Sequence, residues 1–157
     1  MAYQTFQGSL DASDLRIGVV VSRFNEFITE QLGKGALEML EKHGCPHENI
    51  SFVKVPGAWE LPIAAKLLAS HCDAIIALGA VVRGDTPHFE YIAGAAADGL
   101  SRVSLETGVP IAFGVLTTDD MQQAMDRAGG KSGNKGCDAA EVAIELANLI
   151  KQLKETR

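Results

Sequence analysis

The stretch DAIIALGAVV, residues 73–82, decides the fold class of this chain. Its side chains are apolar at both odd and even positions, the pattern of a strand that is covered on both faces in a parallel sheet. The runs LRIGVVVS (15–22), ISFVKV (50–55) and VPIAFGVL (109–116) have the same character. A sheet of such strands needs a layer of helices on each face, so helices are expected between the runs.

Helical patterns occupy those intervals. The segment from Phe27 to His43 carries its apolar residues on one stripe, and Gly44 follows where such a helix would end. The other predicted helices are Glu60 to Ser70, His88 to Thr107, Asp119 to Ala128 with Thr117 and Asp120 as a capping box, and about Asp138 to Lys154. The alternation predicts an α/β fold, a three-layer α/β/α sandwich with a four-stranded parallel, flavodoxin-like sheet.

Residues 1–14 have no evident place in that sheet. The segment YQTFQGS (3–9) has strand-like character but no obvious partner strand within the chain. We therefore expect residues 1–14 to form an N-terminal arm that adds a strand to a neighbouring subunit's sheet, and residues 15–157 to form a single domain. The alternative is a frayed terminus.

Composition and charge exclude several classes of partner. The 157 residues carry a net charge of −6 without a basic block, which argues against nucleic acid as the main partner. The longest apolar run, AIIALGAVV, is far shorter than the ~20 residues of a membrane span. The opening residues lack the pattern of a secretory signal, and Cys45, Cys72 and Cys137 lack CxxC spacing. These features predict a cytoplasmic protein with reduced thiols.

Ligands of open α/β sheets bind beyond the carboxyl ends of the strands, and the third strand end is the richest in chemistry. In RGDTPH (83–88), Pro87 suits the first helical position, with Thr86 as the N-cap. Free N–H groups at that helix start, beside Gly84, would form a small anion site that suits a phosphate. The helix dipole would favour the neutral imidazole of His88, which could then move a proton. The alternative is a well-capped helix start with a surface histidine.

No cofactor or metal signature is present. GGKSGNKG resembles a phosphate-binding loop, but that motif needs glycine where Met125 stands, and the segment follows a helix instead of a strand. His43, His47 and His71 lack the spacing of metal ligands. We therefore expect neither a cofactor nor a metal.

Five motifs in order resemble one known family: SRFN, VPGAWE, GAVVRGDTPHFEY, FGVLTT and RAGGKSGNKG. Together they closely resemble lumazine synthase (6,7-dimethyl-8-ribityllumazine synthase), from about Leu15 to the final helix. The resemblance implies that 5-amino-6-(D-ribitylamino)uracil condenses with 3,4-dihydroxy-2-butanone 4-phosphate. The products would be 6,7-dimethyl-8-ribityllumazine, phosphate and water, in the penultimate step of riboflavin biosynthesis, without cofactor or metal.

The resemblance also implies a role for individual residues. His88 would transfer protons, and Phe24 would stack on the pyrimidine ring. Asp85, Thr86 and Arg127 would bind the butanone phosphate. The remaining residues of the pocket would be Ala58, Trp59, Glu60, Ala80, Val81, Val82, Phe113 and Lys135. In the family, the counterparts of Phe113, Arg127 and Lys135 come from the adjacent subunit.

The family further implies assembly. The helix from His88 carries Gly94, Ala95, Ala96, Ala97 and Gly99, a small-residue face that could pack on its own sheet or around a five-fold axis. We expect a homo-oligomer, as a pentamer and further as a 60-subunit icosahedral shell, with riboflavin synthase as a partner. The alternatives are an archaeal-type riboflavin synthase of related fold, a non-catalytic flavin- or pyrimidine-binding module, and a shell protein without activity.

Overall fold

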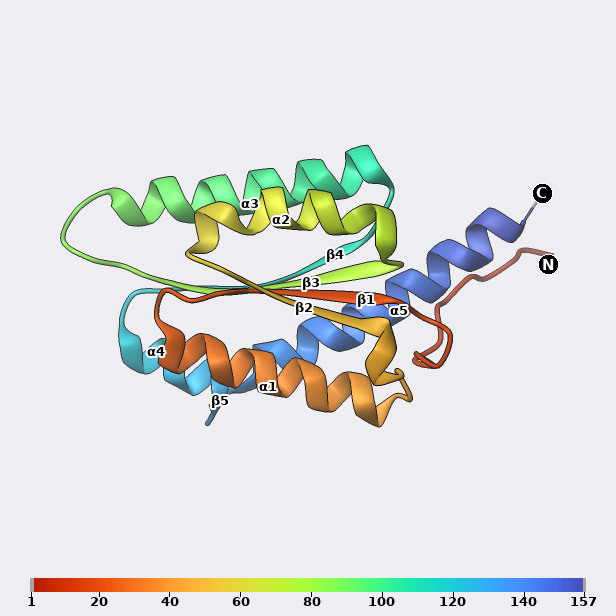
Figure 1. Cartoon of the computed structure of the whole chain (residues 1–157), viewed down its shortest axis with the longest axis horizontal. Coiled ribbons are helices and arrows are strands. Elements are labelled where there is room, and N and C mark those ends of the chain that lie inside the picture. The colour runs from red at the N-terminus through yellow and green to blue at the C-terminus, as the bar shows by residue number, and fades with distance from the viewer. Residues whose placement is uncertain (1, 157) are drawn as a thin grey trace.

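The computed structural model describes residues 2–156 and contains one parallel sheet of four strands between two layers of helices (Figure 1). The strands lie in the order β2-β1-β3-β4, and every neighbouring pair is parallel. They are β1 (Ile17–Ser22), β2 (Ile50–Val55), β3 (Ala74–Val82) and β4 (Ile111–Thr118). This confirms the predicted α/β class and the four-stranded, flavodoxin-like sheet.

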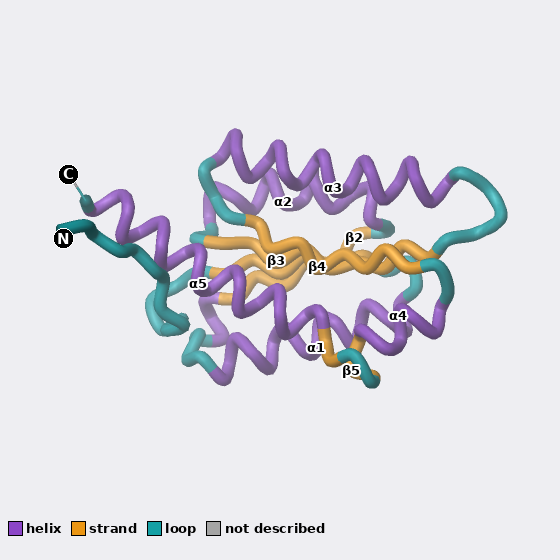
Figure 2. The backbone as a smooth tube through the Cα atoms, turned by 180° about the vertical axis from the view of Figure 1, so that it is seen from behind, coloured by secondary structure: helices purple, strands orange, loops and turns teal. Residues whose placement is uncertain are grey.

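The helices divide between the two faces of the sheet, as Figure 2 shows. One face is covered by α2 (Leu61–Leu68) and α3 (His88–Thr107), and the other by α1 (Glu26–Lys42), α4 (Met121–Arg127) and α5 (Lys135–Glu155). The chain leaves β1 toward one face and β3 toward the other. Adjacent strands whose connections diverge in this way open a crevice at their carboxyl ends.

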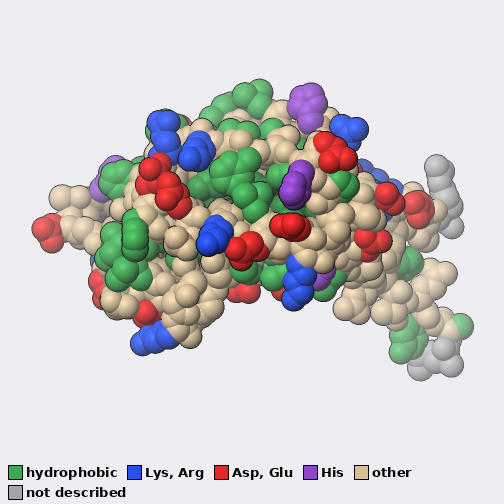
Figure 3. Space-filling model, turned by 60° about the horizontal axis from the view of Figure 1, so that its bottom comes forward, with side chains coloured by type: hydrophobic (Ala, Val, Ile, Leu, Met, Phe, Trp, Pro, Cys, Tyr) green, Lys and Arg blue, Asp and Glu red, His purple; other side chains and the backbone are tan. Residues whose placement is uncertain are grey.

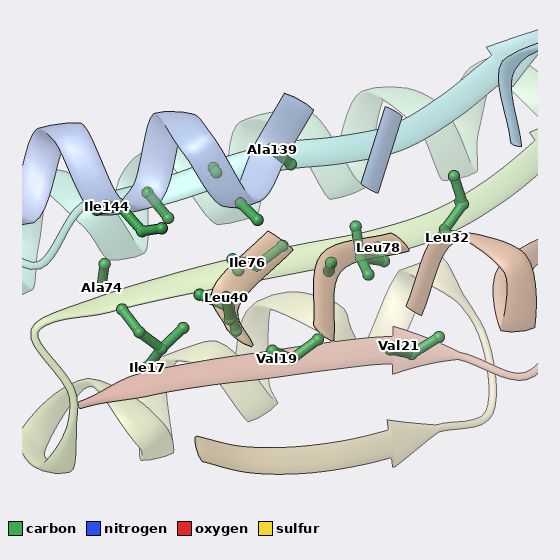
Figure 4. Close-up of a cluster of buried hydrophobic side chains, with 14 of the residues drawn as sticks. Ile17, Val19, Val21, Leu32, Leu40, Ala74, Ile76, Leu78, Ala139 and Ile144 are labelled. Carbon is green, nitrogen blue, oxygen red and sulfur yellow. The ribbon is translucent and has the colours of Figure 1, made fainter. Parts of the chain in front are cut away.

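Each face of the sheet has its own hydrophobic core. Along β1, Ile17, Val19 and Val21 point toward α1 and α5 (Figure 4), whereas Val20 belongs to the cluster under α2 and α3. The two central strands, β1 and β3, are buried along nearly their whole length, as their sequences predict. The expectation of burial on both faces is wrong for the two edge strands, since Phe52 of β2 and Phe113 of β4 are each 41% exposed.

The starts of α4 and α3 differ from the prediction in how the helix is capped. Asp120, not Thr117, caps α4: its Oδ1 accepts a hydrogen bond from the N–H of Gln123 at 2.8 Å. β4 continues through Thr118, so the turn before α4 comes later than the sequence pattern indicates. At α3 the N-cap is Pro87 instead of Thr86, and no side chain caps the helix.

The segment before the last helix is more ordered than its sequence predicts. Two short strands, β5 (Ala128–Gly130) and β6 (Gly133–Asn134), form an antiparallel hairpin, and α5 begins at Lys135 instead of near Asp138. Gly129 and Gly133 have φ angles of 102° and 85°, a region that few other residues adopt. Strands this short and rich in glycine show no apolar alternation, so a hydrophobic pattern cannot reveal them.

The N-terminal arm has no strand partner within the described chain and runs beside the end of α5, away from the carboxyl ends of the strands (Figure 1). Asn148 donates hydrogen bonds to the carbonyls of Ser9 and Asp11, both at 2.9 Å, and Gln152 donates to that of Gln7. The chain is thus tied down from Gln7 onward. The addition of this arm to a neighbouring subunit stays a prediction.

The surface of the protein is mixed in charge. On the face seen in Figure 3, Lys and Arg side chains are scattered among Asp and Glu side chains instead of gathering in one patch. Across residues 2–156 no helix is long and apolar enough to cross a membrane. The three cysteines are free, and burial raises the pKa of each thiol.

Close contact between α1 and α5 sets where α5 begins. A Cβ added to Gly136 would lie 2.0 Å from the carbonyl oxygen of Leu32, and one added to Gly35 would lie 2.6 Å from the side chain of Asn134. The α5 backbone approaches Leu32 this closely only because Gly136 lacks a side chain, and the Asn134 side chain fits against α1 only because Gly35 does. The start of α5, including Lys135, therefore depends on these two glycines.

Replacing Gly136 by alanine should destabilise the protein by about 1–3 kcal/mol, because the new methyl group overlaps a backbone carbonyl that cannot move alone. Gly94→Ala is the matched control. A Cβ at Gly94 meets nothing within 4 Å, so this change should be neutral or stabilising within the chain, by up to about 1 kcal/mol. Denaturant unfolding at one fixed protein concentration measures both. A Gly136→Ala variant as stable as the wild type would contradict the packing argument.

Candidate functional site

A cavity of about 420 Å³ lies at the carboxyl ends of β1, β2 and β3, at the divergence of the β1 and β3 connections. We call it the strand-end cavity. It is lined by Phe24, Asn25, Pro56, Gly57, Ala58, Trp59, Glu60, Ala80, Val81, Val82, Gly84, Thr86, His88, Phe89 and Ile92. Most of these residues are apolar, as in sites for small organic ligands.

The loop after β1 is held by hydrogen bonds to both neighbouring strands. The N–H of Phe24 donates to the carbonyl of Pro56 at 3.0 Å, and Asn25 Nδ2 donates to the carbonyl of Ala80 at 2.9 Å. Asn25 has φ 61°, and it is the only non-glycine residue with positive φ within residues 2–156. Although its backbone is fixed, the Phe24 side chain is 68% exposed. Its ring is therefore available for stacking and is not part of the core.

The segment after β2 forms a single turn of 3₁₀ helix, Ala58–Glu60. Glu60 Oε1 accepts a hydrogen bond from the N–H of Gly57 at 2.9 Å, which closes the turn. Ala58 is buried, whereas Trp59 is 59% exposed. This turn presents a second large aromatic ring to the strand-end cavity.

The segment after β3 contributes Gly84, Thr86 and His88 to the same cavity. His88 is exposed and is the first residue of α3, a helix of 20 residues. Since no side chain caps this helix, its first N–H groups are left to solvent or a ligand, and they favour an anion. Asp85 is exposed as well but does not line the cavity.

Positive charge is missing from the strand-end cavity. None of the residues that line it is Lys or Arg, and its only acidic side chain is Glu60. Arg83, which lies between the lining residues Val82 and Gly84, forms ion pairs with Glu90 and Asp119. The hydrogen bond to Glu90 and, to a smaller extent, the one to Asp119 raise the pKa of Arg83. The Arg83–Glu90 bond also lowers the pKa of Glu90.

Two cations, Arg127 and Lys135, line a second cavity of about 450 Å³ beside the edge strand β4. We call it the β4 cavity. It is lined by Phe113, Val115, Leu116, Thr117, Thr118, Arg127, Ser132, Lys135 and Asp138. Arg127 Nη1 donates to the carbonyl of Gln123 at 3.0 Å, and Arg127 and Lys135 are both exposed.

Lys135 occupies an unfavourable place for a cation. It is the first residue of α5, where the helix dipole disfavours positive charge by about 0.3–1 kcal/mol. Asn134 Oδ1 accepts hydrogen bonds from the N–H groups of Gly136 and Cys137, so the cap offers partial compensation. With Arg127, Lys135 gives the β4 cavity two cations against one acidic side chain, that of Asp138, a balance that favours an anionic group.

The structure thus divides the residues singled out in the sequence into two groups. The strand-end cavity gathers Phe24, Ala58, Trp59, Glu60, Ala80, Val81, Val82, Thr86 and His88. The β4 cavity gathers Phe113, Arg127 and Lys135, and Asp85 lies in neither. Sequence reasoning missed Asn25, Phe89 and Ile92. The i, i+4 spacing of His88 and Ile92 could have indicated the latter, but nothing local indicates the left-handed backbone of Asn25.

One family of known proteins matches this chain. The model of the 6,7-dimethyl-8-ribityllumazine synthase family matches residues 14–151 of the 157-residue chain. The chain belongs to the lumazine synthase family. This confirms the family that the five sequence motifs predicted. Membership in the lumazine synthase family implies a transferase of riboflavin biosynthesis that acts on small molecules and assembles from identical subunits. Within residues 2–156, no group of three or more His, Cys, Asp or Glu side chains is placed to hold a metal ion.

The geometry of Asn25 predicts different effects for two substitutions. Asn25→Gly removes the hydrogen bond to Ala80 and should cost about 0.5–1.5 kcal/mol of stability. Asn25→Ala removes the same bond and also strains the left-handed backbone, which adds about 1–2 kcal/mol. Denaturant unfolding of both variants should therefore rank alanine as the more damaging. The reverse order would show that the backbone angle does not matter.

Proposed function

We propose that this protein condenses 5-amino-6-(D-ribitylamino)uracil with 3,4-dihydroxy-2-butanone 4-phosphate to give 6,7-dimethyl-8-ribityllumazine, phosphate and water. The observation that carries the proposal is the separation of the required groups between two cavities of one chain. Phe24, Trp59 and His88 line the strand-end cavity, whereas Arg127 and Lys135 line the β4 cavity. A phosphate substrate needs both sets.

The strand-end cavity suits the ribitylaminouracil. The exposed rings of Phe24 and Trp59 offer faces on which a planar pyrimidine and its chain can lie. Backbone groups of Ala58 and of residues 80–82 would bind the ring edge and the ribityl chain. Glu60 would accept hydrogen bonds from ribityl hydroxyl groups.

The phosphate of the butanone would bind between two subunits. The uncapped start of α3, with Thr86 and the backbone N–H of Asp85, would hold one side of it. The Asp85 carboxylate itself would repel a phosphate, so its part is assigned to the backbone. Arg127 of a neighbouring subunit would supply the cation that the strand-end cavity lacks, and Phe113 and Lys135 would close the pocket from the same side.

The chemistry then needs few side chains. The amine of the pyrimidine attacks the ketone and water leaves, which gives an imine. Phosphate is eliminated, and the chain closes onto the ribitylamino nitrogen with loss of a second water. Holding both reactants in one pocket can lower the barrier by up to about 7–11 kcal/mol. His88 moves the protons, a contribution of about 10²–10⁴-fold.

The division of the site implies assembly. We propose a cytoplasmic pentamer, with a 60-subunit shell built from pentamers and with riboflavin synthase as a partner. Within residues 2–156 the outer edge of β2 has no strand partner, so the N-terminal arm of a neighbour could add to it. Native mass spectrometry would give the number of subunits, and loss of the shell on deleting residues 2–9 would support the role of the arm.

The reaction itself is tested by mixing the purified protein with both substrates and following lumazine absorbance and fluorescence. A protein-free reaction measures the uncatalysed condensation. We expect acceleration that requires the phosphate substrate. Formation of riboflavin from the lumazine alone would instead indicate a riboflavin synthase, and no acceleration by a folded oligomer would indicate a binding or shell protein.

His88→Ala should slow turnover by about 10²–10⁴-fold without abolishing it, since binding of both substrates remains. Steady-state kinetics with saturating substrates measure the effect. A folded variant that shows no turnover above the protein-free rate would contradict this account of His88.

Arg127→Ala should raise the KM for the phosphate substrate by about 10–100-fold, because it removes one charge-assisted hydrogen bond to the phosphate. The KM for the pyrimidine should change less. A change in the pyrimidine KM alone would contradict the assignment.

Co-expression of the two variants tests whether the site is shared. In random mixed oligomers of His88→Ala and Arg127→Ala subunits, about a quarter of the interfaces would join two intact halves. Activity at low phosphate-substrate concentration should therefore exceed that of either variant alone. The absence of any recovery in confirmed mixed oligomers would place the whole site in one chain.

A further inference from the structure

Arg83 connects the loop after β3 to two other parts of the protein. Its backbone N–H donates to the carbonyl of Thr118 at 2.8 Å, which extends the pairing of β3 and β4 by one residue. Its side chain donates from Nε to Asp119 Oδ1 at 3.1 Å and from Nη1 to Glu90 Oε1. Its Cζ atom also lies 4.3 Å from the centre of the Phe89 ring.

These contacts surround the residues proposed to do the chemistry. The chain leaves β3 just before Arg83 and enters α3, whose first turn contains Glu90, so the Arg83–Glu90 pair closes a loop that contains Thr86 and His88. This loop is exposed, and a Cβ at Gly84 would meet nothing within 4 Å. Loop packing alone therefore restrains residues 84–88 little.

The charge of Arg83 is already neutralised. A cation next to a phosphate site is ordinarily taken for a phosphate ligand. Here two carboxylates hold the guanidinium, and Arg83 does not line the strand-end cavity. Phe89 does line it, so one face of that ring meets the guanidinium while the residue forms part of the cavity wall.

We infer that Arg83 is a positioning residue, which holds the loop of residues 84–88 against α3 and the β4–α4 turn and so places Thr86 and His88 for reaction. The inference rests on the proposed function for its catalytic consequence but not for its structural one. Each exposed ion pair alone contributes little. The planar guanidinium can pair with two carboxylates and stack on a ring at once, which a lysine cannot do.

Arg83→Lys therefore distinguishes a positioning role from phosphate binding, because it keeps the positive charge and removes the planar guanidinium group. If Arg83 positions the loop, this variant should lose about 10-fold or more in kcat, with little change in the KM for the phosphate substrate. Glu90→Ala and Asp119→Ala should lower kcat in the same direction. Because the three side chains act as one unit, adding either change to Arg83→Ala should cause no further loss.

A phosphate ligand would behave in the opposite way. Freed from its carboxylates in Glu90→Ala or Asp119→Ala, the guanidinium would bind the phosphate better and lower its KM, and Arg83→Lys would retain most activity. Either result would overturn the inference. Arg16→Lys is the matched control, because Arg16 is exposed and precedes β1 at the opposite end of the sheet.

A measurement without substrate separates this inference from the proposed function. Amide hydrogen exchange, followed by mass spectrometry, should be faster for residues 91–94, the first amides of α3 with carbonyl partners inside the helix, in Arg83→Lys than in the wild type or Arg16→Lys. Unchanged exchange would overturn the inference even if the enzyme is active. If the wild type does not condense the substrates, the proposed function fails, and the exchange rates still decide whether Arg83 holds the loop.

Discussion

The burial of β1 and β3 on both faces is the constraint on which the rest of this structure depends. Two central strands without a solvent-exposed face require helices above and below, and the chain supplies them by leaving β1 toward one side and β3 toward the other. That divergence opens the strand-end cavity. The site is therefore a consequence of how the core is covered, because the loops after β1 and β3 separate there to reach helices on opposite faces of the sheet.

The distribution of charge follows from the same topology. The strand-end cavity lies where three strands end, and the residues there are mostly apolar or small. β4 ends one position further along the sheet, so the side chains that follow it, including Arg127 and Lys135, line a different cavity. Within one chain the aromatic and cationic halves stay apart. Assembly of identical subunits, which family membership implies, is the arrangement that can bring the two kinds of half together.

Several local features are unfavourable by themselves and are supported by their neighbours. The left-handed backbone of Asn25 is held by its hydrogen bond to β3, and Lys135 stands at the wrong end of a helix dipole beside a capping asparagine. The exposed aromatic side chains of Phe24 and Trp59 also add nothing to the core. Such departures gather around the two cavities, as expected where function and stability make different demands.

The sequence by itself determined the class of fold, the number of main strands, most helices and the family, because buried strands, amphipathic helices and ordered motifs leave patterns within a few residues of one another. It did not reveal the β5–β6 hairpin, the shifted cap at Asp120 or the exposed edge of β2, since these depend on glycine backbone angles and on which strand lies outermost. Only the tertiary structure decided that Arg83 is held by Glu90 and Asp119 and that Asp85 lines neither cavity. Contacts between residues distant in sequence carry no local signal, so charge and spacing along the chain could not assign them.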